Sequence, residues 1–163
     1  MIEIIKADIT SLKVDAIVNA ANNALMGGGG VDGAIHRAAG KELTEACRRL
    51  RGCETGQSKI TKGYELPSKF VIHTVGPVWN NGLADEEELL KSCYKTAMEL
   101  AIDNGVKTIA FPAISTGAYR FPFDKAAQIA YKTIRSVLEQ TDVVESVYLV
   151  CFSDKDSDQL KRV

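Results

Sequence analysis

The chain has 163 residues, of which 45% are hydrophobic and 25% charged, as in a globular domain with one core rather than a disordered or fibrous protein. Its formal net charge of −1 gives no bulk attraction for nucleic acid or an anionic membrane, so we expect neither as a partner. No apolar run is long enough to span a membrane and no signal-peptide pattern opens the chain, so we expect a cytoplasmic protein.

Short apolar runs alternate with amphipathic helical patterns along the whole chain. In chain order they predict strands at 2–5 and 16–19, helices at 33–39 and 41–50, strands at 58–61 and 70–75, a helix at 85–104, a strand at 108–111, a helix opened by Pro122, a strand at 147–151 and a short last helix within 154–163. This alternation predicts a single α/β domain over residues 1–163, with helices covering both faces of one sheet.

The cysteines give no sign of a metal site. Cys47, Cys53, Cys93 and Cys151 show no C-x-x-C spacing, and neither histidine completes a familiar zinc pattern with them. We therefore expect buried, reduced thiols and no metal or other cofactor.

Four consecutive glycines, Gly27–Gly30, follow the second predicted strand and precede a helix that Asp32 opens. Such a run is costly to order, because glycine loses more backbone entropy than any other residue. Before a helix start, however, it offers unpaired N–H groups to an anion. A second glycine-bearing loop, 112–119, leaves the strand at 108–111. Ligands bind beyond the carboxyl ends of the strands in such sheets, so the two loops could clamp a diphosphate on one rim.

Two familiar nucleotide motifs do not fit. Gly28-x-Gly30-x-x-Gly33 matches the dinucleotide fingerprint in form, but the seven residues 20–26 separate its glycines from the predicted strand. Glu54, the nearest acidic candidate for ribose binding, stands in a predicted turn. No Gly-Lys-Ser/Thr follows the glycines, which excludes a P-loop.

Six motifs then occur in a specific order. They are Lys6-Ala-Asp-Ile9, Val18-Asn-Ala-Ala-Asn22, Gly27-Gly-Gly-Gly-Val-Asp-Gly33, His36-Arg-Ala-Ala-Gly40, His73-Thr-Val-Gly-Pro77 and Pro112-Ala-Ile-Ser-Thr-Gly117. Together they closely resemble the macrodomain family over essentially the whole chain, and within it the MacroD-type hydrolases. The resemblance implies a three-layer α/β/α sandwich with a mixed, mostly parallel sheet of about six strands.

The resemblance also implies a cleft for ADP-ribose. Asp8 would accept a hydrogen bond from the adenine amino group, the Ile9 backbone would contact the same ring, and Phe152 would stack on it. Backbone N–H groups would hold the diphosphate at Gly30, Val31, Ser115, Thr116, Gly117 and Ala118. Asn22, Asp32 and Tyr119 would surround the distal ribose. Ala7 and Arg120 depart from the family pattern, since glycine is common at both positions.

Several of these residues have a plain structural interpretation as well. Asp32 could cap its helix, since aspartate is a preferred N-cap residue, and it could serve catalysis at the same time. Asn19 is interpreted as tying down loop backbone, as asparagine often does. His36 and His73 are interpreted as structural, because no carboxylate or nucleophile accompanies them at a recognisable spacing.

The leading hypothesis is an enzyme that hydrolyses esters at the distal ribose of ADP-ribose. Its partners would be ADP-ribose, O-acetyl-ADP-ribose and proteins mono-ADP-ribosylated on Asp or Glu. Asn22 would fix a ribose hydroxyl, and Asp32 would orient or deprotonate the attacking water without a metal, unless a substrate phosphate is the base. The competing hypothesis is a module that binds ADP-ribose without cleaving it. An RNA-associated regulatory role is a third possibility, which the near-neutral charge neither supports nor excludes.

Overall fold

The computed structural model describes residues 1–163, and its centre is one six-stranded sheet with the order β1-β6-β5-β2-β4-β3. All neighbouring strands are parallel except β3 and β4, which pair antiparallel. The strands are β1 (Ile2–Lys6), β2 (Ala16–Ala21), β3 (Ser58–Lys62), β4 (Phe70–Val75), β5 (Thr108–Phe111) and β6 (Ser146–Cys151). The prediction of a mixed, mostly parallel sheet is confirmed.

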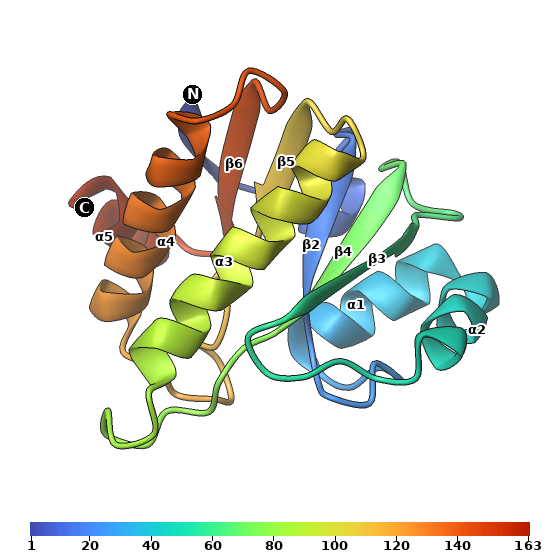
Figure 1. Ribbon diagram of the computed structural model, residues 1–163, viewed down its shortest axis with the longest axis horizontal. Coiled ribbons are helices and arrows are strands. Elements are labelled where there is room, and N and C mark those ends of the chain that lie inside the picture. Colours follow the sequence, from blue (N-terminus) through green and yellow to red (C-terminus); the bar gives the residue numbers. More distant parts are fainter.

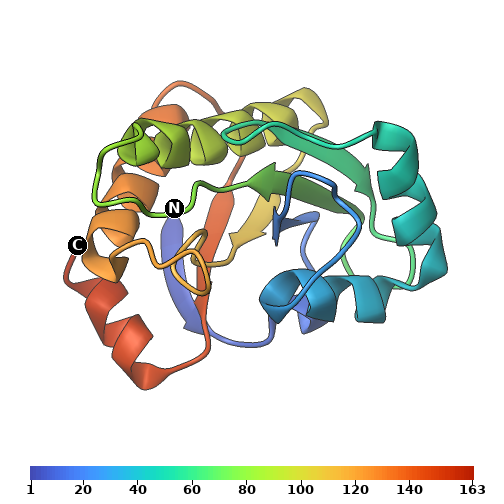
Figure 2. The same cartoon turned by 90° about the horizontal axis from the view of Figure 1, so that it is seen from below.

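Helices cover both faces of this sheet, which confirms the predicted three-layer sandwich (Figure 1). The helices are α1 (Gly30–Ala39), α2 (Lys41–Leu50), α3 (Glu86–Asp103), α4 (Phe123–Leu138) and α5 (Asp154–Lys161), with a short 3-10 helix, η1, at Ile9–Ser11. Seen from below, α3 and α4 lie along one face and α1 along the other, while α5 lies beside α4 and β1 at one edge of the sheet (Figure 2). None of the helices is both long and apolar enough to cross a membrane.

The longest helix, α3, shows how the sequence pattern produces a packed element. Three acidic residues in its first turn favour the positive end of the helix dipole. Its buried residues recur at helical spacing, among them Leu90, Ala97 and Ala101, and form one apolar stripe against the sheet. The helix ends just before Gly105, whose φ of 67° places it in the left-handed region expected of a C-terminal glycine.

The core lies in two layers, one on each face of the sheet. The larger cluster, of 23 buried residues, packs α3 and α4 onto the sheet, and a cluster of 14 lies on the side of α1 and α2. Successive residues of β2 alternate between them, so Val18 belongs to the larger cluster and Ile17 to the smaller. The central strands are therefore buried on both faces, which explains their nearly continuous apolar sequences.

The start of α1 differs from the prediction. The helix begins at Gly30 with Gly29 as its N-cap, so Asp32 lies inside the first turn instead of opening the helix. Glycine disfavours helices, and the sequence pattern therefore placed the start too late. Glycine is nevertheless required at residue 33, because a Cβ added there would lie 2.4 Å from the carbonyl oxygen of Gly28. The glycine loop and the helix thus touch directly.

Candidate active site

A cleft of about 770 Å³ lies at the carboxyl ends of β2, β5 and β6. The first turn of α1, the loop after β5 and the start of α5 enclose it. Of the twelve predicted site residues, eleven line this cleft: Ile9, Asn22, Gly30, Val31, Asp32, Ser115, Thr116, Gly117, Ala118, Tyr119 and Phe152. Asp8 alone does not line it. The structure thus brings together residues that lie more than a hundred positions apart in the sequence.

One wall of the cleft is the first turn of α1. Because the helix begins at Gly30, the backbone N–H groups of Gly30, Val31 and Asp32 have no partner within it. Gly30 has a φ of 58°, a conformation that side-chain-bearing residues rarely adopt. A Cβ added there would meet nothing within 4 Å, so backbone conformation rather than crowding favours glycine at this position. This wall offers unpaired N–H donors at the positive end of a helix dipole.

The opposite wall is the loop that follows β5. The N–H groups of Arg120 and Phe121 donate to the carbonyls of Gly117 and Ser115, each at 2.9 Å, and fold the loop back on itself. The N–H groups of Gly117 and Ala118 take no part in these backbone hydrogen bonds. The two glycine-bearing loops therefore line a single cleft, as the sequence predicted, and each carries free N–H donors.

The loop after β5 also rests on the end of β4. Ser115 adopts a φ of 66°, and its buried Oγ has no hydrogen-bond partner. A Cβ added at Gly76 would lie 2.2 Å from that oxygen, so only glycine at residue 76 allows the loop to approach this closely. Gly76 lines the cleft and was missed as a site residue, although it stands in one of the six motifs.

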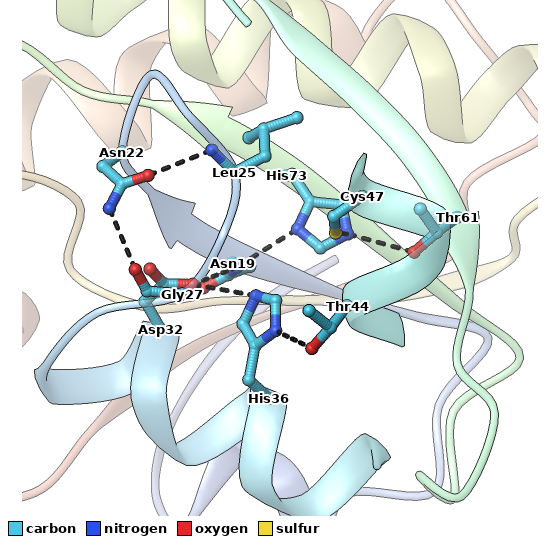
Figure 3. Close-up of polar contacts among 10 residues, drawn as sticks. All are labelled: Asn19, Asn22, Leu25, Gly27, Asp32, His36, Thr44, Cys47, Thr61 and His73. Carbon is cyan, nitrogen blue, oxygen red and sulfur yellow. Dashed lines mark hydrogen bonds and ion pairs between the residues drawn. The ribbon is translucent and has the colours of Figure 1, made fainter. Parts of the chain in front are cut away.

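Asp32 is only 5% exposed, and its two carboxylate oxygens have different surroundings. Oδ1 accepts a hydrogen bond of 2.8 Å from Nδ2 of Asn19 and lies 3.4 Å from Nε2 of His36 (Figure 3). Oδ2 has no partner in the protein and lies beside Gly28 of the cleft, 3.4 Å from where a Cβ of that residue would stand. The interpretation of Asp32 as a helix cap is wrong, because Gly29 occupies the cap and no side chain bonds there.

Asn22 is bound to its own loop. Its Nδ2 donates to the carbonyl of Gly27 at 3.1 Å, and its Oδ1 accepts from the N–H of Leu25 at 3.0 Å (Figure 3). The same Nδ2 lies 3.5 Å from the Cβ position of Gly28, so Asn22 and Asp32 flank that glycine. In this structure Asn22 shapes the glycine loop, and its contact with a ribose stays a prediction.

Asn19 and His73 lie behind Asp32, outside the lining of the cleft, and sequence reasoning missed this pair as well. They are register partners on the parallel strands β2 and β4, and Nδ2 of Asn19 lies 3.1 Å from Nδ1 of His73. Asn19 was expected to tie down loop backbone, and this is wrong, because β2 extends to Ala21 and keeps Asn19 inside the strand. The sequence did contain a signal for this pair, because Asn19 and His73 are polar residues that each stand within an apolar run. His73 is fully buried, as its structural interpretation implied.

Burial is the main cause of the pKa shifts at His73 and at its neighbour Cys47. It lowers the pKa of His73 to about 4, with nearby His36 lowering it further and Asp32 opposing the shift. Burial, helped by Asp32, raises the pKa of the Cys47 thiol to about 11. All four cysteines are free and buried, as predicted, and Cys93 has a similarly raised pKa of about 11.

No group of three or more His, Cys, Asp or Glu side chains is arranged to hold a metal ion.

The other end of the cleft is more open. Phe152 follows β6 directly and is 66% exposed. Lys155, Asp156 and Gln159 of α5 also line the cleft there, and sequence reasoning did not find them. The apolar pattern of α5 is too short to show which of its residues face inward.

Asp8 lies beside the cleft as the cap of η1. Its Oδ1 accepts from the backbone N–H of Thr10 at 3.0 Å and from the hydroxyl of the same residue at 2.7 Å. The side chain is exposed, so Oδ2 is open to solvent. Its assignment to an adenine amino group stays a prediction.

The two departures from the family pattern fall outside the cleft. Arg120 has a φ of 61°, the conformation that would favour glycine there, and its side chain is exposed. Ala7 has no positive φ, and its N–H donates to the carbonyl of Cys151 at 3.1 Å. Neither residue disturbs the walls described above.

Comparisons with known proteins agree with this geometry. A family model described as Macro domain matches residues 18–130. A Macro domain-containing protein of Chlorobaculum tepidum is 62% identical over 158 residues, which cover 97% of this chain and 92% of that protein. An Escherichia fergusonii protein named O-acetyl-ADP-ribose deacetylase is 52% identical over 160 residues, 96% of this chain and 90% of the relative. The solved structure of a glycine-to-valine mutant of the Oceanobacillus iheyensis macrodomain with ADPR is 46% identical, with a TM-score of 0.94 over 99% of this chain and 90% of that one.

Proposed function

This chain belongs to the Macro domain family, and from that premise we propose that its cleft binds ADP-ribose and hydrolyses esters at the distal ribose. The substrates would be O-acetyl-ADP-ribose and proteins mono-ADP-ribosylated on Asp or Glu. The name of the Escherichia fergusonii relative supports the first of these, and the ADPR bound to the Oceanobacillus iheyensis macrodomain supports the ligand.

The diphosphate would lie between the two glycine-bearing walls. The N–H groups of Gly30 and Val31 would bind it on one side, and those of Gly117 and Ala118 on the other. Lysine or arginine side chains are not required where this many preorganised donors converge on an anion. At the open end of the cleft, the exposed Phe152 ring is available to stack on adenine beside Ile9.

The distal ribose would then reach the buried carboxylate of Asp32. Oδ2 would orient the water that attacks the ester carbonyl carbon, and either this oxygen or a substrate phosphate would take its proton. The tetrahedral intermediate would collapse by breaking the bond between the carbonyl carbon and the ribose oxygen, and that oxygen would leave as a hydroxyl by taking the proton that the base had removed from the water. The products are ADP-ribose and a carboxylate, and we propose that no metal takes part.

One observation carries this proposal. Asp32 presents a single unpartnered carboxylate oxygen to the cleft, while its other oxygen is fixed by Asn19. Because Gly29 caps the helix, Asp32 is not needed as a cap, and its free oxygen is available to the ligand of this cleft.

The test is to incubate the protein with O-acetyl-ADP-ribose and with a protein mono-ADP-ribosylated on glutamate, and to measure release of acetate and of ADP-ribose. Both should be released. A protein ADP-ribosylated on arginine is the matched control and should stay intact, because its linkage is not an ester. Micromolar binding of ADP-ribose without release of either product would contradict the hydrolase.

That contrary result would favour the second candidate, a module that binds ADP-ribose without cleaving it. The observation in its favour is that the Asn22 amide already binds its own loop, through one N–H of Nδ2 and through Oδ1, and so holds the glycine loop in a shape that binding alone would require.

A further inference from the structure

A chain of hydrogen bonds runs from the edge of the sheet to the Asp32 carboxylate, and its direction can be assigned. The hydroxyl of Thr61 donates to the carbonyl of Lys62 at 3.0 Å. Its oxygen, 3.0 Å from Nε2 of His73, must therefore accept, which requires a proton on Nε2. His73 is thus the neutral Nε2–H tautomer, and its Nδ1 is an acceptor.

The acceptor at Nδ1 determines how the Asn19 amide lies. Nδ2 of Asn19 has two N–H groups, and one donates to His73 Nδ1 while the other donates to Asp32 Oδ1. The reversed amide would place a carbonyl oxygen against a carboxylate and against a nitrogen lone pair. In this orientation the buried Oδ1 of Asn19 has no hydrogen-bond partner, which lowers the stability of the folded protein.

We propose that His73 is a positioning residue for the reaction, because its Nδ1 holds the Asn19 amide in the orientation that fixes Asp32. The inference rests on the proposed hydrolysis, since it assigns the function of a group behind Asp32. His73 does not line the cleft and touches no substrate, so it acts only through Asn19.

The surroundings of His73 keep it in this state at neutral pH. Facing it are Asn19 on β2, Lys59 and Thr61 on β3, Asp32 and His36 on α1, and Cys47 on α2. The Lys59 amine is bound to the carbonyls of Leu50 and Gly52 instead. Cys47 stays a thiol, because burial raises its pKa. No neighbour therefore competes for Nδ1, and burial disfavours a second proton on the ring.

The test compares two substitutions of similar shape. His73→Asn keeps an acceptor oxygen near the place of Nδ1, whereas His73→Leu does not, and both lose the bond to Thr61. We expect His73→Leu to lower kcat roughly tenfold or more through a misplaced Asp32, and His73→Asn to stay within about threefold of the wild type. The affinity for ADP-ribose should not change in either variant, because the phosphate-binding loops are untouched. Equal kcat values for a folded His73→Leu and the wild type would overturn the proposal.

A second measurement does not depend on variants or on turnover. Nitrogen-15 NMR of the wild-type protein should show His73 as the Nε2–H tautomer, and Thr61→Ser, which keeps the accepting hydroxyl, should show the same tautomer. A wild-type Nδ1–H tautomer would overturn the proposal even if His73→Leu fails to fold. Absence of turnover in the wild type would overturn the proposed hydrolase, and the NMR result would then show separately whether the hydrogen-bond chain exists.

Discussion

Two neighbouring pairs of residues at the centre of the sheet differ in almost every respect. Val18 pairs with Ile72 across β2 and β4, and both face the apolar core under α3 and α4. One residue further on, Asn19 pairs with His73, and both face α1. All four side chains are fully buried. The first pair is hydrophobic and the second is polar, although the same two strands carry both.

The difference separates what stabilises the fold from what builds the site. Burying Val18 and Ile72 removes apolar surface from water and stabilises the protein. Burying Asn19 and His73 removes polar groups from water, which costs free energy. Their hydrogen bonds offset this cost only in part, since Oδ1 of Asn19 has no partner. Their evident consequence is a fixed Asp32 at the end of the cleft. We therefore assign the apolar pair to stability and the polar pair to the site.

The largest effect on stability should follow truncation of the apolar pair. Ile72→Ala should lower the free energy of unfolding by about 4 kcal/mol, because it removes buried methyl groups and leaves a cavity. Urea unfolding measures this, with Ile72→Val as a matched control that costs about 1 kcal/mol. Turnover per folded molecule should be unchanged. A large fall in kcat for a folded Ile72→Val would break the assignment.

Because His73 of the polar pair is buried in its neutral form, we expect the free energy of unfolding to depend on pH. His73 has a pKa of about 4 in the folded protein and an ordinary value of 6.5 in the unfolded chain. Between these values only the unfolded chain takes up the proton. The contribution of neutral His73 to the free energy of unfolding is therefore fully present above pH 6.5 and is lost as the pH falls toward 4. The loss is about 3 kcal/mol in total.

Urea unfolding at several pH values between 7 and 4 gives this slope. Carboxylates titrate in the lower part of the range as well, so the informative quantity is the difference between the wild type and His73→Asn. The variant should lack the part of the slope between pH 6.5 and 5. Identical slopes in the two proteins would show that His73 is not buried in its neutral form.

The smallest expected effect is that of a chelator. Because Asp32 is proposed to act on water without a metal, turnover in excess EDTA should equal turnover without it. The comparison is made on one preparation of protein, and magnesium or zinc is then added back. A loss in EDTA that is restored by either ion would move the chemistry from the carboxylate to a bound metal.

Much of the fold could be predicted because its signals are local. Helix α2 at Lys41–Leu50 and strands β4 and β5 have the predicted bounds, since amphipathic spacing, apolar runs and flanking glycines mark them in the sequence. The two glycine-bearing loops that line the cleft were also found, because glycines between a strand and a helix are a recognisable local signal. The expectation of a mixed, mostly parallel sheet of about six strands followed from the family resemblance and not from periodicity.

The polar pair could not be predicted in the same way. Asn19 and His73 are 54 positions apart, and only the parallel register of β2 and β4 makes them partners. In a strand buried on both faces, alternation does not show which side chain faces the site. Asp32 was misjudged as a cap because α1 begins inside the glycine run, at Gly30, where helix propensity does not predict a start.

The most direct test of the assignment is to measure turnover and unfolding together for Asp32→Ala. The account predicts at least about a 100-fold loss of kcat with ADP-ribose affinity largely kept, because the group that acts on the water is gone. It also predicts a change in the free energy of unfolding of less than about 1 kcal/mol, since removing a costly buried charge offsets the lost hydrogen bond and the opened cleft admits water. Turnover that survives, together with a stability loss as large as that of Ile72→Ala, would contradict it.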